Sequence, residues 1–449
     1  MWIVFSCRTA SISTVLGGVT AGESPLWTRL RATIAVFLLL AVGSPSEALA
    51  QRSLKLERQR AHLMLKTVSK YIQRDFHDPD LKGVDWEALV AQASDQIDSV
   101  ETPGEMYSAI FAVVNALQDS HTVFAPPRRQ VRYRFGFEAQ AYGEEVLVSE
   151  VESNGAASRA GLQPGDRLLL VNGFNARRES FDLMMIFFRA LRPVAEMELV
   201  FEREGKTPQM IRVIGDAKRE ALVTDLTDID NVYQLIREAQ SEEEQVVFGT
   251  LDPDISYLKL AGFRGDDHAL KILAKKLKKA PAMVVDLRGN PGGTVWALKY
   301  FLGFFETEKT TIAQFVRRDK IEPVEVKPQT PNLAGPLFIL VDAQTSSAAE
   351  IFARYFQRLG RATVIGDRTS GRVTVARYHP FEVGAGTVVV YGLQLATARV
   401  VFPGGEELEG SGVIPDKHCL PSREDLRLGR DRCLEVARAA ARQALSVGH

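Results

Sequence analysis

Cysteine is scarce in this chain, with three in 449 residues. The sequence contains no CxxC pair, no HExxH motif and no cluster of histidines and cysteines, so it predicts neither a metal site nor a cofactor. An excess of one charge is also lacking, because 55 Lys and Arg residues stand against 56 Asp and Glu residues. This balance gives no bulk attraction to nucleic acid or to an anionic membrane surface.

A long hydrophobic run is missing near the start of the chain, where the apolar stretch at residues 34–42 is short for a membrane span. Arg29 and Arg31 precede this stretch, and Ala48-Leu49-Ala50 follows it as a small-x-small cleavage site. The pattern predicts a signal peptide over residues 1–50 and therefore a periplasmic or secreted protein. An uncleaved membrane anchor is the alternative.

Removal of the signal peptide would leave two cysteines, Cys419 and Cys433. In an oxidising compartment they would form a disulfide that ties down the C-terminal tail. Two free buried thiols are the alternative if the protein stays reduced.

The composition, with 45% apolar and 25% charged residues, is that of a folded protein long enough for two or three domains. Apolar residues recur at helical spacing from residue 54 to residue 125, which predicts a helical N-terminal unit. Short alternating strands with tight turns follow, and residues 216–250 have the charged, mixed composition of a solvated linker.

Residues 337–350 read LFILVDAQTSSAAE, an uninterrupted apolar strand that ends in small hydroxyl residues and then begins a helix. Such a strand is typical of a parallel sheet buried on both faces. Ser347 would lie at the helix N-terminus, where free N–H groups and the helix dipole favour a nearby negative charge. Ser347 is therefore either a helix-capping serine or a nucleophile, and the neighbouring Ser346 is the control position.

A second strand end carries Asp286-Leu287-Arg288-Gly289-Asn290-Pro291-Gly292-Gly293. Adjacent glycines allow a substrate to approach the backbone closely. A phosphate loop is one interpretation, but the GxxxxGK[ST] form is absent. We expect an oxyanion hole instead, formed by an N–H of Gly292 or Gly293 together with the N–H of Ala348.

Residues 160–173, AGLQPGDRLLLVNG, resemble the characteristic sequence of a PDZ domain. The resemblance implies that Phe135-Gly136-Phe137 is the loop that binds a ligand's terminal carboxylate through backbone N–H groups. The adjoining strand would pair with a bound peptide.

The whole set of motifs resembles the tail-specific, or C-terminal processing, serine peptidases and their tricorn-type and retinoid-binding relatives. DLRGNPGG, TSSAAE, residues 360–366 and residues 409–416 occur in the order and spacing of that family. The resemblance implies that Ser347 is the nucleophile.

One residue departs from the tail-specific pattern: Arg372 stands where those peptidases have a lysine as general base. Arginine stays protonated and cannot accept the proton. Tricorn-type relatives use a histidine preceded by serine, together with a glutamate before Gly-Val-x-Pro-Asp, and Ser120-His121 and Glu409 match these positions. The resemblance implies that His121 is the base, that Ser120 and Glu409 support it, and that Arg372 contacts a substrate carboxylate or forms a structural ion pair.

These observations predict a multidomain α/β protein: a helical unit, a PDZ domain and a ClpP/crotonase-like α/β core. The expected boundaries are 1–50 for the signal peptide, 51–128 for the helical unit, 129–215 for the PDZ domain, 216–420 for the core and 421–449 for a helical tail. The predicted function is that of a serine endopeptidase that cleaves near protein C-termini through an acyl-enzyme. Its partners would be protein or peptide substrates captured by the PDZ domain, with no nucleic acid, and with a membrane only if the signal segment is retained.

Two other functions fit the sequence. A pseudo-peptidase that binds peptides or lipophilic ligands is suggested by the loss of the lysine. A PDZ scaffold in a cell-envelope assembly is the third interpretation.

Overall fold

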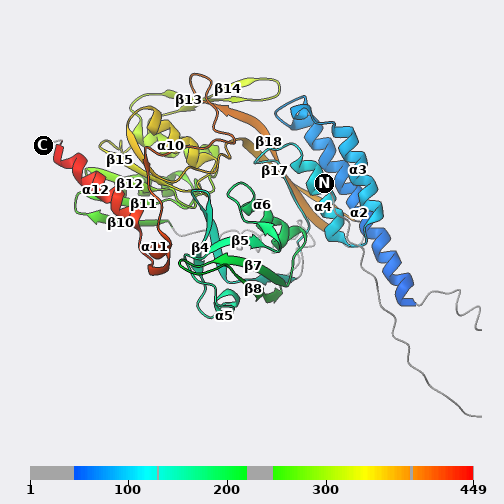
Figure 1. The fold of residues 1–449 in the computed structure, drawn as a ribbon. Coiled ribbons are helices and arrows are strands. Elements are labelled where there is room, and N and C mark those ends of the chain that lie inside the picture. Colours follow the sequence, from blue (N-terminus) through cyan, green and yellow to red (C-terminus); the bar gives the residue numbers. More distant parts are fainter. Residues whose placement is uncertain (1–44, 129–130, 220–245, 385–387, 448–449) are drawn as a thin grey trace, which may run out of the picture. The chain divides into compact units, whose positions relative to one another are not determined.

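A computed structural model describes residues 45–128, 131–219, 246–384 and 388–447 (Figure 1). The chain divides into two compact units, residues 1–56 and residues 57–449. The apolar run of the predicted signal peptide lies outside the described residues. Among the helices that are described, none has the length and apolarity needed to cross a membrane.

The predicted helical unit is present. Its elements are α2 (Pro45–Asp75), η1 (Leu81–Gly83), α3 (Trp86–Ser99) and α4 (Pro103–Asn115). Side-chain caps fix two of the starts, because Asp85 accepts the N–H of Ala88 and Thr102 accepts the N–H of Glu105. The helical pattern was predicted to extend to residue 125. The last residues of the unit instead form β1 (Val123–Ala125), a strand that pairs with residues near 393.

The predicted PDZ domain is built on a sheet with the strand order β3-β4-β5-β7-β8. The bounds are β3 (Phe137–Tyr142), β4 (Glu145–Val151), β5 (Arg167–Val171), β6 (Phe174–Asn175), β7 (Glu196–Glu202) and β8 (Gln209–Ile214), with helices α5 (Ala156–Arg159), α6 (Phe181–Ile186) and η2 (Phe187–Leu191). Asn172 and Gly173 both have positive φ and form the predicted tight turn between β5 and β6. Among the described strands none pairs with the outer side of β3, which is the side at which a peptide would add to the sheet.

Part of the predicted linker is strand. β9 (Asp216–Arg219) pairs with β2 (Val131–Arg134), and β10 (Val247–Asp252) pairs with the first strand of the core. The charged composition of β9 hid that strand, because all four of its side chains are exposed. Residues 220–245 lie outside the described residues.

The core sheet has the order β10-β11-β12-β15-β16-β19, and every pair except β10–β11 is parallel. Its further strands are β11 (Ile255–Lys259), β12 (Ala282–Asp286), β15 (Leu337–Val341), β16 (Ala362–Gly366) and β19 (Lys417–His418). All residues of β12 and β15 are buried, as the uninterrupted apolar runs predict.

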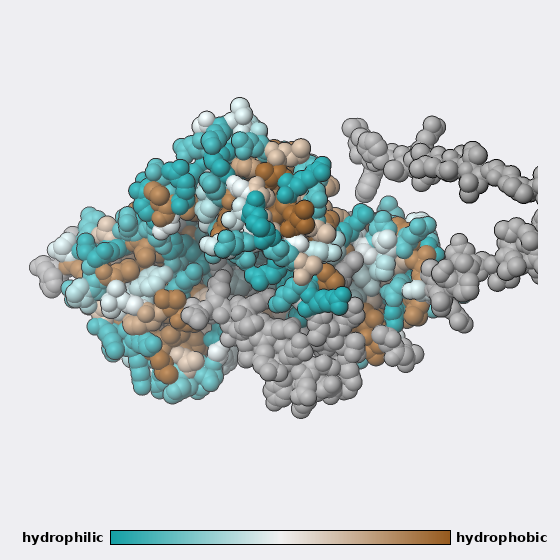
Figure 2. All heavy atoms as spheres, turned by 90° about the horizontal axis from the view of Figure 1, so that it is seen from below, coloured by the Kyte–Doolittle hydropathy of each residue, from teal (hydrophilic) through white to brown (hydrophobic). Residues whose placement is uncertain are grey.

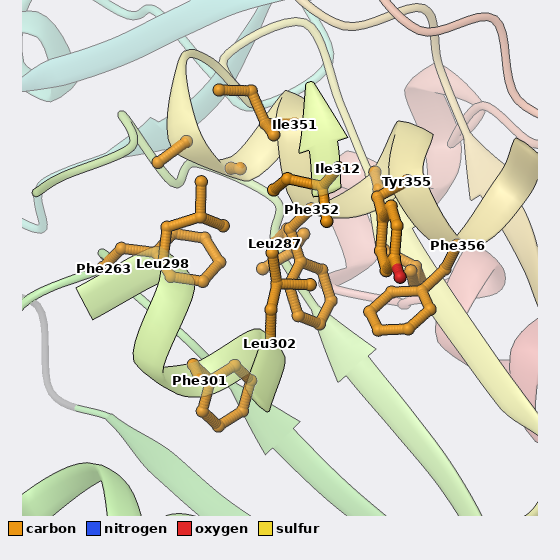
Figure 3. Packing of buried hydrophobic residues seen from close by; sticks show 14 of the residues in the cluster. Phe263, Leu287, Leu298, Phe301, Leu302, Ile312, Ile351, Phe352, Tyr355 and Phe356 are labelled. Carbon is orange, nitrogen blue, oxygen red and sulfur yellow. The ribbon is translucent and has the colours of Figure 1, made fainter. Parts of the chain in front are cut away.

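Helices cover both faces of this sheet. One face, with Met283 and Val285, packs against α8 (Asp267–Leu277), α9 (Val295–Leu302), η3 (Gly303–Phe305) and α10 (Ala348–Arg358). Figure 3 shows this packing, in which Phe301 and Phe352 lie with centroids 5.7 Å apart. The other face, with Val284 and Phe338, packs against α12 (Arg432–Val447).

A second core sheet was not predicted. It contains β1, β13 (Thr310–Val316), β14 (Ile321–Val326), β17 (Val375–Val383) and β18 (Val389–Val401). Its pairing partners lie far apart in the sequence, and β18 joins β1, β13 and β17, so local periodicity gives little sign of it.

The C-terminal tail contains the disulfide between Cys419 and Cys433, the first of the two alternatives for these cysteines. Helix α11 (Arg423–Leu428) lies in the loop that the disulfide closes. Arg423 forms ion pairs with Glu145 and Glu202 of the PDZ domain.

On the molecular face in Figure 2, hydrophilic and hydrophobic side chains are interspersed.

Candidate active site

Ser347 is the N-cap residue of α10, at the corner that follows β15. Its φ of 57° and ψ of −121° are unusual for a residue with a side chain. A conformation of this kind costs on the order of 1–3 kcal/mol and persists only where surrounding contacts hold it. The buried Thr345 supplies one such contact through a 2.8 Å hydrogen bond from its hydroxyl to the carbonyl of Leu287.

The predicted glycine turn lies directly against this corner. A Cβ on Gly292 would come within 2.6 Å of the Ser347 Cβ and 3.0 Å of the Ala348 nitrogen. Gly292 has φ +98°, and its N–H donates to the side chain of Asn290 over 2.8 Å. The N–H groups of Gly293 and Ala348 have no hydrogen-bond acceptor among the described residues. The turn therefore offers space and two donors beside the serine.

Glu350, in the first turn of α10, holds this corner to the loop at residues 369–372. Its fully buried carboxylate accepts the N–H groups of Ser347, Gly371 and Arg372 at 2.8–3.0 Å. The hydroxyls of Thr369 and Ser370 donate to the same carboxylate. Burial raises the pKa of Glu350, and the hydrogen bonds oppose that rise.

Ser120, His121 and Glu409 lie together, although 289 residues separate the first from the last. The Ser120 hydroxyl and His121 Nδ1 are 2.9 Å apart, and the Ser120 N–H donates to Glu409 over 3.2 Å. The other Glu409 oxygen accepts the N–H of Val373 over 2.7 Å. Glu409 thus joins the histidine turn to the loop that contacts Ser347.

Burial lowers the pKa of His121 below the ordinary value of 6.5. The negative charges of Glu409 and Asp119 oppose this shift, and the positive charge of Arg372 adds to it. The imidazole is therefore neutral at pH 7 and able to accept a proton.

Arg372 contributes its backbone and its side chain to different contacts. Its carbonyl accepts the N–H of Ser347 over 2.8 Å. Its guanidinium pairs with Asp182 on α6 of the PDZ domain, at 3.2 Å. The two roles predicted for Arg372 were contact with a substrate carboxylate and a structural ion pair. The structure contains an ion pair, in which the Arg372 side chain is 42% exposed.

Within the described residues, no hydrogen bond joins the His121 imidazole to the Ser347 hydroxyl. The two residues are linked indirectly, from Ser347 through Arg372 and Val373 to Glu409 and Ser120. No cluster of three or more potential metal ligands occurs in the part of the chain that the structure describes.

The predicted carboxylate loop of the PDZ domain has its side chains turned inward. Phe135 and Phe137 are buried in the domain core, so only the backbone of this loop is suited to a ligand carboxylate. Next to it lies a groove of about 470 Å³. The groove is lined by β3, by α6 and η2, and by Gly289, Pro291 and Ser346 of the core. The edge strand β3 and the serine corner therefore share one cavity.

Several polar residues of the site were not singled out from the sequence. Asn290 and Asp342 are buried and connect the two strand ends: Asn290 accepts the N–H of Ser346 on its carbonyl, and Asp342 accepts the N–H of Gly289. Both stand inside the motifs quoted above. Buried strand ends with Asp or Asn at such positions are a signal that could have identified them.

A strained serine at a helix start, with two backbone donors beside it, is an arrangement suited to nucleophilic attack and to an oxyanion. Residues 254–419 match the model of peptidase family S41, and residues 127–190 match the PDZ domain model. Residues 254–419 are thus similar to the S41 peptidases, and relatives named carboxy-terminal processing protease and tail-specific protease match the family predicted from the sequence.

Two relatives illustrate the similarity. Carboxyl-terminal-processing peptidase 1, chloroplastic, of Arabidopsis thaliana is 26% identical over 62% of this chain and 53% of its own length. Carboxy-terminal processing protease CtpB of Bacillus subtilis is 20% identical over 72% of this chain and 64% of its own length. The alignments thus span less than two thirds of either relative.

Two solved structures share the fold. Mature CPAF complexed with lactacystin superposes with a TM-score of 0.63, at 13% identity, over 86% of this chain and 98% of its own. The photosystem II D1 C-terminal processing protease superposes with a TM-score of 0.50, at 19% identity, over 80% of this chain and 93% of its own. The predicted combination of an α/β core with a PDZ domain and N-terminal helices is confirmed.

Proposed function

We propose that this protein is a serine endopeptidase that cleaves substrate proteins near their C-termini through an acyl-enzyme. The observation that carries the proposal is the strained Ser347 packed against Gly292, with the N–H groups of Gly293 and Ala348 beside it. Strain at a nucleophile with free donors next to it suits a tetrahedral oxyanion.

In the proposed mechanism His121 Nδ1–H donates to Ser120, which leaves Nε2 as the proton acceptor. The Ser347 oxygen attacks the peptide carbonyl as its proton passes to His121. The N–H groups of Gly293 and Ala348 stabilise the oxyanion, and Gly292 provides space, because its own N–H is already bonded to Asn290. His121 then protonates the leaving amine, and water releases the acyl group by the same steps. Glu409 favours the imidazolium electrostatically.

The approach of His121 to Ser347 is part of the proposal. A hydrogen bond between base and nucleophile is often long or absent before a substrate binds. A movement that carries Ser347 and the 369–372 loop together toward the 119–122 turn would bring them together.

A fluorophosphonate probe tests the proposal directly. Wild-type protein should be labelled on Ser347, and Ser347→Ala should not be labelled, while Ser346→Ala serves as the matched control and should retain labelling. An unlabelled but folded wild type would contradict the enzyme function. It would favour a pseudo-peptidase, for which the absent His121–Ser347 hydrogen bond and Arg372 are the supporting observations.

Substrate capture by the PDZ domain is a second element of the proposal. The groove of about 470 Å³ runs from the edge strand β3 to Ser346, so a captured C-terminus would lie close to the nucleophile. We expect Ser347→Ala protein to bind fluorescent peptides that end in a free carboxylate, and to bind their C-terminal amides at least ~10-fold more weakly. Equal binding would exclude carboxylate capture by the Phe135–Phe137 backbone.

We further propose that the protein is exported to the periplasm or the medium. Arginines, a short apolar run and a small-x-small site precede Gln51, and the disulfide suits an oxidising compartment. N-terminal sequencing of protein from that compartment should begin at Gln51. A start upstream of residue 34 would indicate a retained anchor.

A further inference from the structure

Asp119 precedes Ser120 and His121, and its side chain has no solvent-accessible surface. One carboxylate oxygen accepts the His121 N–H over 3.1 Å and the Thr122 hydroxyl over 2.9 Å. These contacts close a turn in which the Asp119 side chain binds His121 and Thr122, the residues two and three positions further along the chain. The backbone of His121 is therefore fixed by Asp119.

The same carboxylate connects the turn to two distant elements. Its second oxygen lies 3.3 Å from His77 Nε2, just beyond the end of α2, and 3.7 Å from Lys82 Nζ. The Thr122 hydroxyl also accepts the N–H of Ala396 in β18 over 3.2 Å. A turn held from both sides limits where the His121 ring can lie.

Asp119 is negatively charged in the folded protein. Burial opposes ionisation, but hydrogen bonds from His77 and Thr122, the charge of Lys82 and the His121 N–H together lower the pKa of Asp119. The charged groups that act on His121 are Glu409, Asp119 and Arg372. Two anions therefore oppose the effect of burial on the histidine, and Asp119 is one of them.

We propose that Asp119 is a positioning residue for His121: it fixes the backbone of the base through the His121 N–H, and its buried charge sets how readily the imidazole takes up a proton. The inference rests on the proposed function, in which His121 is the general base. Asp119 acts through His121 and does not itself contact the reacting atoms.

Two substitutions separate the two effects. In Asp119→Asn, the amide oxygen can still accept the His121 N–H and the Thr122 hydroxyl, but the charge is lost. In Asp119→Ala, both the acceptor and the charge are lost. Asp78→Asn is the matched control, because Asp78 in the same helical unit also accepts two backbone N–H groups, at Asp80 and Lys82.

The probe is a fluorophosphonate. At each pH, the rate at which it labels Ser347 is measured against probe concentration, which gives a binding constant and a maximal rate. We expect Asp119→Asn to lower the maximal rate about 10-fold and Asp119→Ala about 100-fold, within the range that general-base catalysis supplies. The binding constant should stay within about threefold of wild type. The acid limb of the Asp119→Asn profile should move to lower pH, because removal of a nearby negative charge makes the imidazole easier to deprotonate. Asp78→Asn should label as the wild type does.

A second measurement does not depend on catalysis. NMR titration of labelled histidines in Ser347→Ala protein, with His121 assigned by His121→Gln, should give a lower pKa for His121 when Asp119→Asn is added. An Asp119→Asn protein with the wild-type His121 titration and the wild-type labelling profile would overturn the inference. If wild-type protein is not labelled at all, the proposed function fails, and the NMR titration still decides whether Asp119 tunes His121. If Asp119→Ala does not fold, Asp119→Asn carries the test.

Discussion

At the scale of single residues, the proposed site depends on one serine and one histidine whose surroundings give them unusual properties. Ser347 has positive φ, and its N–H donates to the carbonyl of Arg372 and to the carboxylate of Glu350. His121 is kept neutral by burial, against the pull of Glu409 and Asp119. Sequence motifs indicated both residues, but the strain and the burial come from contacts with distant segments.

The pH dependence of activity follows from the lowered pKa of His121. In the proposed mechanism the neutral imidazole is the active form, and a pKa below 6.5 means that this form is already dominant at neutrality. Activity should therefore be full at pH 7 and fall on acidification through a single ionisation below pH 6.5. The measurement is the fluorophosphonate labelling rate between pH 4.5 and 8.5. An acid limb above pH 7, or unchanged labelling in His121→Gln, would exclude His121 as the base.

Gly292→Ala tests the space beside the nucleophile. The added Cβ would lie 2.6 Å from the Ser347 Cβ, and the alanine would have to keep φ near +98°. We expect Ser347 labelling to fall at least ~100-fold, comparable to the loss of an oxyanion donor. Gly289→Ala is the matched control with positive φ, because its Cβ would meet only the Gln344 side chain at 3.9 Å. Near-normal labelling of Gly292→Ala would show that the turn is not tightly packed against the serine.

At the scale of elements, α10 and the 369–372 loop act as one unit because Glu350 joins them. Five donors converge on its buried carboxylate, three from backbone N–H groups and two from hydroxyls. The position of Ser347 therefore depends on a loop that follows it by more than twenty residues.

Glu350→Gln should weaken this unit. One oxygen is replaced by an NH₂ group, which would face donors and leave buried groups unsatisfied at about 1–3 kcal/mol each. We expect a lower melting temperature and a loss of Ser347 labelling of at least ~10-fold. Glu407→Gln, at a partly exposed glutamate, should leave both unchanged. Equal behaviour of the two variants would contradict the role assigned to Glu350.

The Cys419–Cys433 disulfide also acts at this scale, since it closes a loop with a sequence separation of 14 that contains α11. Loss of a cross-link of this length lowers the free energy of unfolding by about 3 kcal/mol. We expect Cys419→Ser/Cys433→Ser protein to melt at a lower temperature and to be cleaved faster by trypsin within residues 420–432. Unchanged melting and cleavage would mean that packing alone holds the tail.

At the scale of the whole molecule, buried and exposed ion pairs connect the PDZ domain to the core. Arg178 and Asp367 are 2.8 Å apart, with side chains only 8% and 7% exposed. Arg178 also donates to the carbonyls of Gly143 and Arg368, and Asp367 accepts the N–H of Gly143. Arg372 and Asp182 form a second, more exposed connection.

Asp367→Asn should loosen the PDZ domain from the core. Removal of one partner leaves the buried Arg178 guanidinium without its counter-charge, at a cost of about 3–5 kcal/mol. We expect faster limited proteolysis between the domains and a larger radius of gyration by X-ray scattering. Asp182→Asn, which breaks the exposed pair, should change both much less. The reverse order would mean that Arg372–Asp182 is the stronger connection.

The sequence by itself determined the elements whose signals are local. Uninterrupted apolar runs fixed the parallel strands β12 and β15, because a strand buried on both faces needs no polar side chain. Glycine-rich and hydroxyl-rich strand ends marked both halves of the site around Gly292 and Ser347. The motif match to Ser120, His121 and Glu409 named side chains that the fold does bring together.

Only the tertiary structure decided how these parts are connected. The second core sheet, the Glu350 contacts and the Asp119 turn all join residues whose pairing depends on packing and not on local spacing. The pairing of Arg372 with Asp182 is likewise set by how the PDZ domain and the core pack. Buried polar groups must find partners wherever the chain brings them, and a single sequence does not reveal those partners before the chain has folded.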